Sequence, residues 1–445
     1  MNAGHPAAPP RRPPLPDGPY LVVGLRMAGA AVARLLRERD CGEVIGCDTG
    51  APEEAAALDW VEVHLGTEGS ELVERAGAVI KSPGVSRSAP VVAAALERGL
   101  PVLGELELGW RLLGNEFVAV TGTNGKTTTV ELLGAIHRAA GVPVEVAGNV
   151  GRPVAALVGS AATDAVVVCE ASSFQLEDAV AFAPESAVLL NVTEDHLDRH
   201  ASVKAYREAK LRIFASQGEG DLAVVPAGFG AIPGKARVVA FGEDDDATLA
   251  LRDGALWWSG ERVIGADEIR LRGAHNLENA LAASGAALAR GIGSEVVAAA
   301  LREFPGVAHR MEDVAEVAGV LYVNDSKATN VDSALHAIEA FDAPLHLILG
   351  GSLKGGGFQG LGGAVAERCR ACYLIGEAAD RIAADLAGAV PLRRCDDLAR
   401  AVEQAAAAAG PGEVVLLSPA CASYDQFRDF EQRGERFRAL VRALD

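Results

Sequence analysis

The sequence predicts an α/β protein of three domains, and three observations support this along its 445 residues. Short apolar runs typical of buried strands alternate with longer segments of helical periodicity, as in parallel sheets covered by helices. Glycine-containing turns follow many of these runs, and 50 glycines supply them. The length itself suits about three ordinary domains. We therefore expect a Rossmann-like N-terminal domain, a central P-loop ATPase-type parallel sheet and a Rossmann-like C-terminal domain.

Changes in this pattern give the predicted domain boundaries. The opening residues are Pro-rich and are predicted to form an extended tail. Behind them, a strand at 20–23, a glycine turn, a helix and a second strand at 43–47 followed by the acidic Asp48 resemble a Rossmann opening, although the glycine pattern is degenerate. The predicted parts are a tail at 1–17, a substrate-binding domain at 18–113, a central ATP-binding domain at 114–304 and a C-terminal domain at 305–445.

Composition argues against several classes of partner. The formal net charge of −19 disfavours nonspecific binding to nucleic acid or to anionic membranes. The chain has no run of 18 apolar residues and no apolar core of a secretory signal near its N-terminus, so we expect no membrane insertion. The seven scattered cysteines favour reduced thiols and the cytoplasm. We interpret the one C-x-x-C, Cys369 and Cys372, as two partly buried thiols.

Residues 117–130 carry the strongest functional signal, a predicted phosphate-binding loop. An apolar strand is followed by Gly-Thr-Asn-Gly-Lys-Thr and then by a helical pattern. Gly122 and Gly125 permit a tight turn whose N–H groups point inward, at the positively polarised N-terminus of a helix. Lys126 is predicted to reach the β- and γ-phosphates of ATP, and Thr127 to bind Mg²⁺. We favour this interpretation over an ordinary Gly-rich turn, although the loop is shorter than the usual P-loop pattern.

Three further polar residues are candidates with competing explanations. Glu170 ends the next predicted strand, where a carboxylate is suited to bind Mg²⁺ but is also common as an exposed group. His196 lies in a polar loop, where histidines are more often surface residues than ligands. Lys210 lies among apolar positions of a helix, a pattern that on its own favours a snorkelling surface lysine.

Polar loops also follow strands in the C-terminal half, at 324–330, 350–358 and 418–427, and polar segments lie at 275–279 and 309–310. Each taken alone is as typical of a plain loop as of a site. Ligands bind at the carboxyl ends of parallel strands, so several such loops together indicate a binding edge.

Taken in order, these segments resemble the Mur ligase family over residues 20–440. The segments that carry the resemblance are Thr-Gly-Thr-Asn-Gly-Lys-Thr-Thr (121–128), Gly-Asn-Val-Gly (148–151), Glu-Ala-Ser-Ser-Phe-Gln-Leu (170–176), Asn-Val-Thr-Glu-Asp-His-Leu-Asp-Arg (191–199), His-Asn-Leu-Glu-Asn (275–279), His-Arg (309–310), Asn-Asp-Ser-Lys-Ala-Thr-Asn (324–330) and Ser-Pro-Ala-Cys-Ala-Ser-Tyr-Asp-Gln-Phe (418–427). The last two, with Phe-Glu-Gln-Arg-Gly at 430–434, are similar to the glutamate-adding branch.

The resemblance implies an ATP-dependent amide ligase of peptidoglycan precursor synthesis. ATP would convert a substrate carboxylate to an acyl phosphate, which the amine of glutamate attacks. The implied partners are small molecules: UDP-N-acetylmuramoyl-L-alanine, glutamate and ATP with two Mg²⁺ ions. The protein is expected to be a monomer.

The resemblance also assigns residues to roles. Catalytic roles fall to Lys126, His196 and Lys210. The nucleotide would be bound by Gly122, Thr123, Asn124, Gly125, Lys126, Thr127, Thr128, Asn276, Asn279, Arg310, Asp325 and Lys327. Thr127 and Glu170 would hold one Mg²⁺, and His196 with a carbamylated Lys210 the second. The muramoyl substrate would contact Asp48, Thr49, Ser82, Gly84, Asn149, Ser172 and Gln175, and glutamate would contact Thr329, Lys354, Ser423 and Phe430.

Two alternatives stay open from the sequence. Another ligase of the superfamily, such as a diamino-acid-adding Mur ligase or folylpolyglutamate synthase, would share the central loop but not the Ser-Pro-Ala-Cys-Ala-Ser segment. A P-loop switch ATPase would not need the loops around Lys354 and Ser423. The first-domain turn at 26–28 and Gly50 depart from the residues that relatives often carry there, which affects the expected uridine and pyrophosphate contacts.

Overall fold

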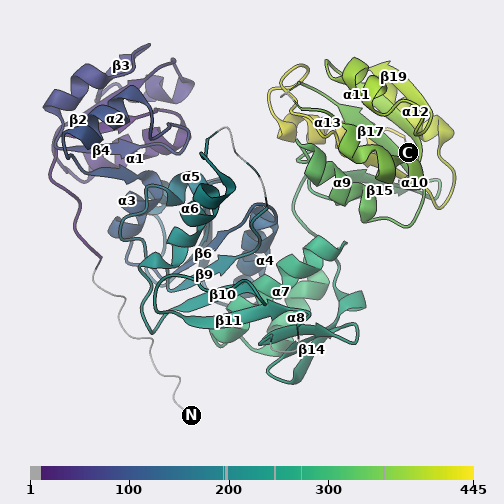
Figure 1. The fold of residues 1–445 in the computed structure, drawn as a ribbon, viewed down its shortest axis with the longest axis horizontal. Coiled ribbons are helices and arrows are strands. Elements are labelled where there is room, and N and C mark those ends of the chain that lie inside the picture. The colour runs from purple at the N-terminus through teal and green to yellow at the C-terminus, as the bar shows by residue number, and fades with distance from the viewer. Residues whose placement is uncertain are drawn as a thin grey trace. The chain divides into compact units, whose positions relative to one another are not determined.

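The structure, a computed structural model, describes residues 12–444 except 194, 196–198, 245–246, 272 and 354–355. It contains three α/β sheets, each with helices packed against it (Figure 1), which confirms the predicted fold class. The chain divides into two compact units. The first comprises Met1–Glu268 and Glu278–Arg302, and the second comprises Ile269–Leu277 and Glu303–Asp445.

The first sheet is fully parallel, with the strand order β3-β2-β1-β4-β5. This doubly wound order places a ligand crevice at the carboxyl ends of the two strands flanking the point where the order reverses. The strands are β1 Tyr20–Val23, β2 Val44–Asp48, β3 Glu62–Leu65, β4 Ala78–Lys81 and β5 Val102–Gly104, and the helices are α1 Met27–Glu38, α2 Pro90–Glu97 and α3 Glu105–Leu112.

The second sheet has the order β14-β13-β12-β11-β10-β9-β6-β8-β7. It is parallel from β7 to β12, and the hairpin strands β13 and β14 are antiparallel. Its strands are β6 Phe117–Thr121, β7 Val144–Gly148, β8 Val166–Glu170, β9 Ser186–Leu189, β10 Leu222–Pro226, β11 Arg237–Gly242, β12 Leu249–Arg252, β13 Ala255–Trp258 and β14 Glu261–Gly265. Its helices are α4 Lys126–Ala139, α5 Ser173–Leu176, α6 Val203–Ala215, α7 Ala274–Ala289 and α8 Ser294–Glu303.

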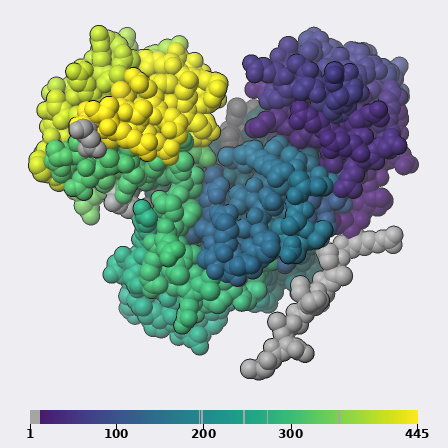
Figure 2. Space-filling view, turned by 180° about the vertical axis from the view of Figure 1, so that it is seen from behind, coloured from purple at the N-terminus to yellow at the C-terminus, as the bar shows by residue number. Residues whose placement is uncertain are grey.

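The third sheet lies in the second unit, whose surface runs from green to yellow in Figure 2. Its order is β15-β16-β20-β17-β18-β19, and only the β15–β16 pair is antiparallel. The strands are β15 Glu312–Val317, β16 Val320–Asn324, β17 Leu345–Gly350, β18 Cys369–Ile375, β19 Leu392–Asp396 and β20 Val414–Leu417, and the helices are α9 Val331–Glu339, α10 Gly362–Arg368, α11 Ala379–Asp385, α12 Leu398–Ala408 and α13 Phe430–Arg442.

Small aliphatic side chains build the cores of these sheets. All five residues of β6 are buried, and β6 pairs with β8 on one side and β9 on the other. A strand buried on both faces explains why its sequence is a continuous apolar run rather than an alternating one. Each buried Val or Leu contributes about 1.5–3 kcal/mol relative to an exposed one. This rigid strand is what fixes the position of the loop that follows it.

Buried charges join the first two sheets near residue 110. Glu107, on α3, accepts hydrogen bonds from the backbone N–H groups of Val180 and Ala181 at 3.1–3.2 Å. Arg12 lies within the segment predicted as a tail, yet its side chain is only 7% exposed. Its guanidinium donates to backbone carbonyls at the end of α3, including that of Trp110 at 2.6 Å, and lies 3.6 Å from Glu185. Arg12 therefore anchors the approach to β1 on the central sheet.

Two features of the described residues concern membranes and cysteines. No helix among the described residues is long and apolar enough to cross a membrane. Cys369 and Cys372 are both buried free thiols. A hydrogen bond with Cys369 raises the pKa of Cys372, and burial also contributes to this rise.

Candidate active site

The phosphate loop connects β6 to α4, as predicted. Gly125 has a φ of +85°, a left-handed conformation that favours glycine. A Cβ atom at Gly125 would overlap the side-chain oxygen of Asn279, which therefore packs closely against this glycine. The same contact places Asn279, a predicted nucleotide residue from α7, directly against the loop. The loop thus leads into the N-terminus of α4, where the first N–H groups have no acceptor within the helix and, with the helix dipole, favour anions.

Two lysines meet at the backbone carbonyl of Gly122. Lys126 donates from Nζ to Gly122 O at 2.9 Å and to Thr123 O at 2.7 Å, so its ammonium lies over the loop. Lys210 donates from α6 to the same Gly122 O at 2.7 Å and is only 1% exposed. Burial, together with the positive charge of Lys126, lowers the pKa of Lys210 to about 6. The snorkelling alternative for Lys210 is therefore wrong.

Oxygen ligands gather on the other side of the loop. Thr127 donates from Oγ1 to Glu170 Oε2 at 2.7 Å, and Asn149 donates from Nδ2 to Glu170 Oε1 at 3.0 Å. Glu170 is 3% exposed and ends β8, beside β6. A hydroxyl and a carboxylate at a phosphate loop are the oxygen donors that Mg²⁺ prefers, so these side chains fit the ion. Asn149, predicted for the muramoyl substrate, lies beside this pair.

A loop brace that the sequence did not reveal comes from the segment after β9. The side-chain oxygen of Asn191 accepts hydrogen bonds from the N–H groups of Thr123 at 3.0 Å and Asn124 at 2.9 Å. The Thr123 hydroxyl accepts from Thr193 N at 3.0 Å and from Tyr206 Oη at 3.2 Å. These contacts hold the loop open in a fixed shape. The sequence analysis did single out the segment 191–199, which begins with Asn191. Nothing in its pattern, however, indicated that Asn191 rather than His196 contacts the phosphate loop.

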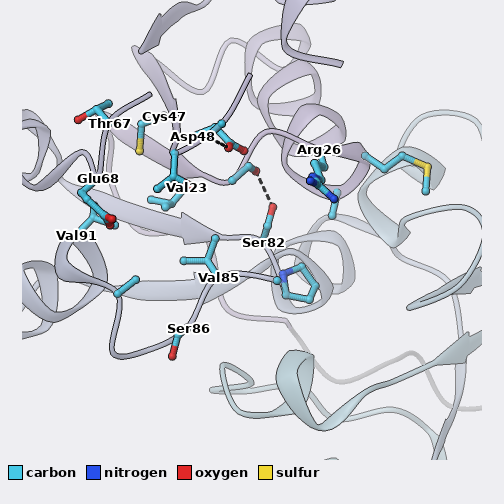
Figure 3. A pocket seen from close by; sticks show the side chains of 18 residues that line it. Val23, Arg26, Cys47, Asp48, Thr67, Glu68, Ser82, Val85, Ser86 and Val91 are labelled. Carbon is cyan, nitrogen blue, oxygen red and sulfur yellow. Dashed lines mark hydrogen bonds between the residues drawn. The ribbon is translucent and has the colours of Figure 1, made fainter. Parts of the chain in front are cut away.

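The first sheet carries a cavity of about 550 Å³ at its carboxyl edge. Asp48, Thr49, Ser82 and Gly84, all predicted for the nucleotide-sugar substrate, line it together. Figure 3 shows Asp48, Ser82 and Val85 around this cavity, at the ends of β2 and β4. Asp48 accepts from Leu25 N at 2.7 Å and Gly50 N at 2.8 Å, and Ser82 donates to Gly24 O at 2.7 Å. These hydrogen bonds fix the positions of Asp48 and Ser82 in the wall of the cavity.

Ser172 and Gln175, also predicted to contact substrate, form a capping box at the start of α5. Gln175 N donates to Ser172 Oγ at 3.3 Å, and Ser172 N donates to the Gln175 side-chain oxygen at 3.0 Å. This reciprocal arrangement satisfies two free N–H groups of the helix. It fixes the short helix directly after Glu170.

The second unit contains several predicted nucleotide residues, and one of them, Asp325, is a buried carboxyl. Asp325 follows β16 and accepts from Ser418 Oγ at 2.8 Å and Met311 N at 3.2 Å. Burial raises the pKa of Asp325 to about 7, while Ser418 and the charge of Arg310 oppose that rise. The ammonium of Lys327 lies 5.5 Å from the centre of the Phe430 ring. Asn276 also belongs to this unit and is buried.

The loops predicted to hold glutamate are tied together by a buried arginine that the sequence did not single out. Arg433 is 0% exposed, and burial lowers its pKa to about 10. Its guanidinium donates to Ser326 O at 2.8 Å, Cys421 O at 3.1 Å and Ala422 O at 3.2 Å. Buried Ser423 and half-buried Thr329 lie in or beside these loops, and Phe430 begins α13. Arg433 therefore fixes the strand-end loops around the predicted glutamate site.

His196 and Lys354 lie outside the described residues. Among the residues that are described, no three His, Cys, Asp or Glu side chains group closely enough to hold a metal ion. Thr127 and Glu170, which the resemblance assigns to one Mg²⁺, both lie among the described residues and are hydrogen-bonded to each other.

Three family models match this chain. The matching descriptions are "Mur ligase MurD-like, N-terminal domain" at residues 19–104, "Mur ligase middle domain" at 120–287 and "Mur ligase, glutamate ligase domain" at 309–421. The chain belongs to the Mur ligase family, and it is accordingly an ATP-dependent ligase that forms carbon–nitrogen bonds. The predicted resemblance is thereby confirmed.

Within this family, similar curated proteins carry one particular name. The UDP-N-acetylmuramoylalanine–D-glutamate ligase of Pelotomaculum thermopropionicum is 42% identical, over 95% of this chain and 97% of that protein. The ligase of the same name from Acidobacterium capsulatum is also 42% identical, over 95% and 96%.

Solved structures share the fold at lower identity. The UDP-N-acetylmuramate–alanine ligase MurC of Thermotoga maritima aligns with a TM-score of 0.62 and 19% identity, covering 96% of this chain and all of that one. MurF ligase of the same organism, in complex with ADP, has a TM-score of 0.62 and 18% identity, over 91% and 96%.

Proposed function

We propose that this Mur ligase joins D-glutamate to UDP-N-acetylmuramoyl-L-alanine with the hydrolysis of ATP, in the cytoplasmic synthesis of peptidoglycan precursors. The observation that supports the chemistry is the phosphate loop with Lys126, Thr127 and Glu170 at one sheet edge. The choice of substrates rests on the names of relatives that align over nearly the whole chain.

The reaction must first activate a carboxylate, because a free carboxylate does not acylate an amine near neutral pH. A carboxylate oxygen of the muramoyl-alanine attacks the γ-phosphorus of ATP, and ADP leaves. The amine of glutamate then attacks the acyl carbon, loses a proton, and inorganic phosphate departs. Lys126 would stabilise the transferred phosphoryl group, and the α4 N-terminus the phosphates behind it. Thr127 and Glu170 would hold Mg²⁺, which would offset the repulsion between the two anions.

A second Mg²⁺ needs an anion on the α6 side of the loop, and Lys210 is our candidate. A buried lysine with a pKa of about 6 is mostly a neutral amine near pH 7. Such an amine adds to CO₂ to give a carbamate and releases one proton. The product replaces a buried amine by an oxygen-bearing anion suited to Mg²⁺. His196 would share this ion.

We further propose a division of labour between the predicted domains. The domain at 18–113 would bind the nucleotide sugar in the cavity with Asp48 and Ser82, and 114–304 would bind ATP. The domain at 305–445 would bind glutamate and supply Arg310, Asp325 and Lys327 to the nucleotide. Residues held on different domains must come together for attack, so we propose a hinge near Pro305-Gly306, where Gly306 has a φ of +90°. The protein would act as a monomer.

One assay tests the proposed function directly. The protein is incubated with UDP-N-acetylmuramoyl-L-alanine, ATP, Mg²⁺ and either glutamate enantiomer, and the product is weighed by mass spectrometry. We expect a glutamyl adduct with D-glutamate and ATP hydrolysis that depends on the muramoyl substrate. ATP hydrolysis at the same rate with and without the muramoyl substrate would instead indicate a switch ATPase. An adduct formed only with a diamino acid would indicate another member of the family.

Ser423 should govern the affinity for glutamate. It is 2% exposed in the loop after β20, and its backbone carbonyl accepts from Gln426 N at 3.2 Å and Phe427 N at 2.8 Å, which fixes the backbone of the loop at this residue. We expect Ser423→Ala to raise the apparent KM for glutamate about tenfold, the effect of one lost polar contact of roughly 1.4 kcal/mol, and to spare ATP. Ser333→Ala, the same change in the first turn of α9, is the control and should alter neither KM. A Ser423→Ala enzyme that bound ATP poorly but glutamate normally would contradict the assignment, and Lys354→Ala should behave like Ser423→Ala.

A further inference from the structure

A buried lysine lies directly beside the cavity of the first sheet. Lys81 is the last residue of β4, and its side chain is 0% exposed. The next five residues, 82–86, all line the cavity, and this segment is here called the pocket loop. A buried ammonium is strongly destabilising unless it is paired, so the partners of Lys81 need an explanation.

Lys81 has two partners, one on each side of a junction. Its Nζ donates to Val85 O at 2.7 Å, within the pocket loop. The same Nζ lies 2.6 Å from Oδ2 of Asp178. Asp178 belongs to the part of the chain that forms the central sheet, and its side chain is 2% exposed. One ammonium therefore bridges the wall of the substrate cavity and the segment that follows α5.

Asp178 is itself fixed in place. A Cβ at Gly104 would lie 3.3 Å from the Asp178 Cβ, so the end of β5 packs against this residue. Asp178 lies eight positions after Glu170, and the capping box of α5 rigidifies the chain between them. The pocket loop is thus connected to Glu170 through Lys81, Asp178 and the short capped helix α5.

A second cation holds the same pocket loop from the central sheet. Arg199 donates to Gly84 O at 3.1 Å and to Val85 O at 3.4 Å, and its guanidinium lies 4.5 Å from the centre of the Phe174 ring on α5. Two independent contacts therefore connect the pocket loop with the elements around Glu170.

A buried ion pair is weak support for stability alone, since apolar replacements of similar volume are often neutral or stabilising. An apolar pair, however, makes no directional bond to Val85 O. We propose that Lys81, paired with Asp178, is a positioning residue that holds the pocket loop in the shape that binds the nucleotide-sugar substrate and aligns that substrate with the phosphate loop. This inference rests on the proposed function, because it assumes that this cavity receives that substrate.

The test uses the full-length enzyme and the double variant Lys81→Met/Asp178→Leu, which removes both charges and keeps the volume. We expect the variant to fold with a melting temperature close to that of the wild type. Its Kd and KM for UDP-N-acetylmuramoyl-L-alanine should rise about tenfold or more, corresponding to roughly 1.4 kcal/mol, while the KM values for ATP and glutamate stay within about twofold. Binding is measured by calorimetry without ATP, so the readout does not require turnover.

Arg87→Met is the matched control. Arg87 lies 3.8 Å from the same Asp178 carboxylate but is 36% exposed and contacts no carbonyl of the pocket loop in the described hydrogen bonds. We expect its substrate Kd to change by less than about threefold, as for a surface ion pair. A folded double variant with unchanged affinity for the muramoyl substrate would overturn the inference and leave the proposed function intact. A wild-type protein that bound the substrate but added no glutamate would overturn the proposed function and leave the inference intact.

Discussion

Lys126→Ala is expected to reduce ligation by roughly 10²–10³-fold, because transition-state charge stabilisation by one group is typically of that size. The Lys126 ammonium lies within hydrogen-bond distance of two carbonyls of the phosphate loop, where a γ-phosphate would bind. The loop keeps its brace from Asn191 and its glycine at 125, so the fold should survive. Steady-state ligation and a melting curve measure the two effects separately.

Two further variants sharpen this prediction. Lys204→Ala removes a lysine of α6 that is 84% exposed, and we expect normal ligation from it. Lys126→Arg keeps the charge but changes its shape, so it should recover only part of the rate. Near-normal turnover by Lys126→Ala would show that the phosphate loop is not the centre of the chemistry.

The sequence predicted those elements whose signal is local. β1 has the predicted bounds, because it is a buried apolar run. The edge strands β3 and β15 were missed: half-exposed edge strands carry no continuous apolar run, and their pairing partners lie elsewhere in the chain.

The functional residues divide in the same way, into those with a local sequence signal and those without one. The phosphate loop is a contiguous motif with a fixed spacing, and the pattern alone indicated it. Lys210, Lys81 and Arg433 each have a partner that is distant in the sequence, 88, 97 and 107 positions away respectively, and helical or strand periodicity does not reveal such partners. Periodicity alone placed Lys210 at the surface, and only the resemblance to a family indicated otherwise. The burial and pairing of these three cations therefore follow from the fold and could not be predicted from the local sequence pattern.

Lys210→Ala is expected to reduce ligation by a factor similar to that for Lys126, because the proposal makes Lys210 a ligand of the second Mg²⁺. Its amine lies 2.7 Å from Gly122 O and has a pKa of about 6, so the neutral, CO₂-reactive form dominates above that pH. Carbamate occupancy should rise with pH through about 6 and fall when CO₂ is removed. ¹³C-NMR of protein equilibrated with ¹³CO₂ measures this occupancy directly, and intact mass gives an independent check.

The sign of the stability effect supplies a second readout. The pKa of Lys210 is depressed from its usual value of 10.5 to about 6 in the folded protein, so between these values the unfolded chain binds more protons. In CO₂-free buffer this lysine therefore makes the protein more stable as pH rises from about 6, and Lys210→Met should flatten that slope. Lys210→Arg is the control for charge, because an arginine stays protonated, cannot form the carbamate and should remain inactive at every pH. A CO₂-free enzyme with full activity, or an active Lys210→Arg variant, would contradict the carbamate and return Lys210 to a role as a buried amine that supports the Gly122 carbonyl.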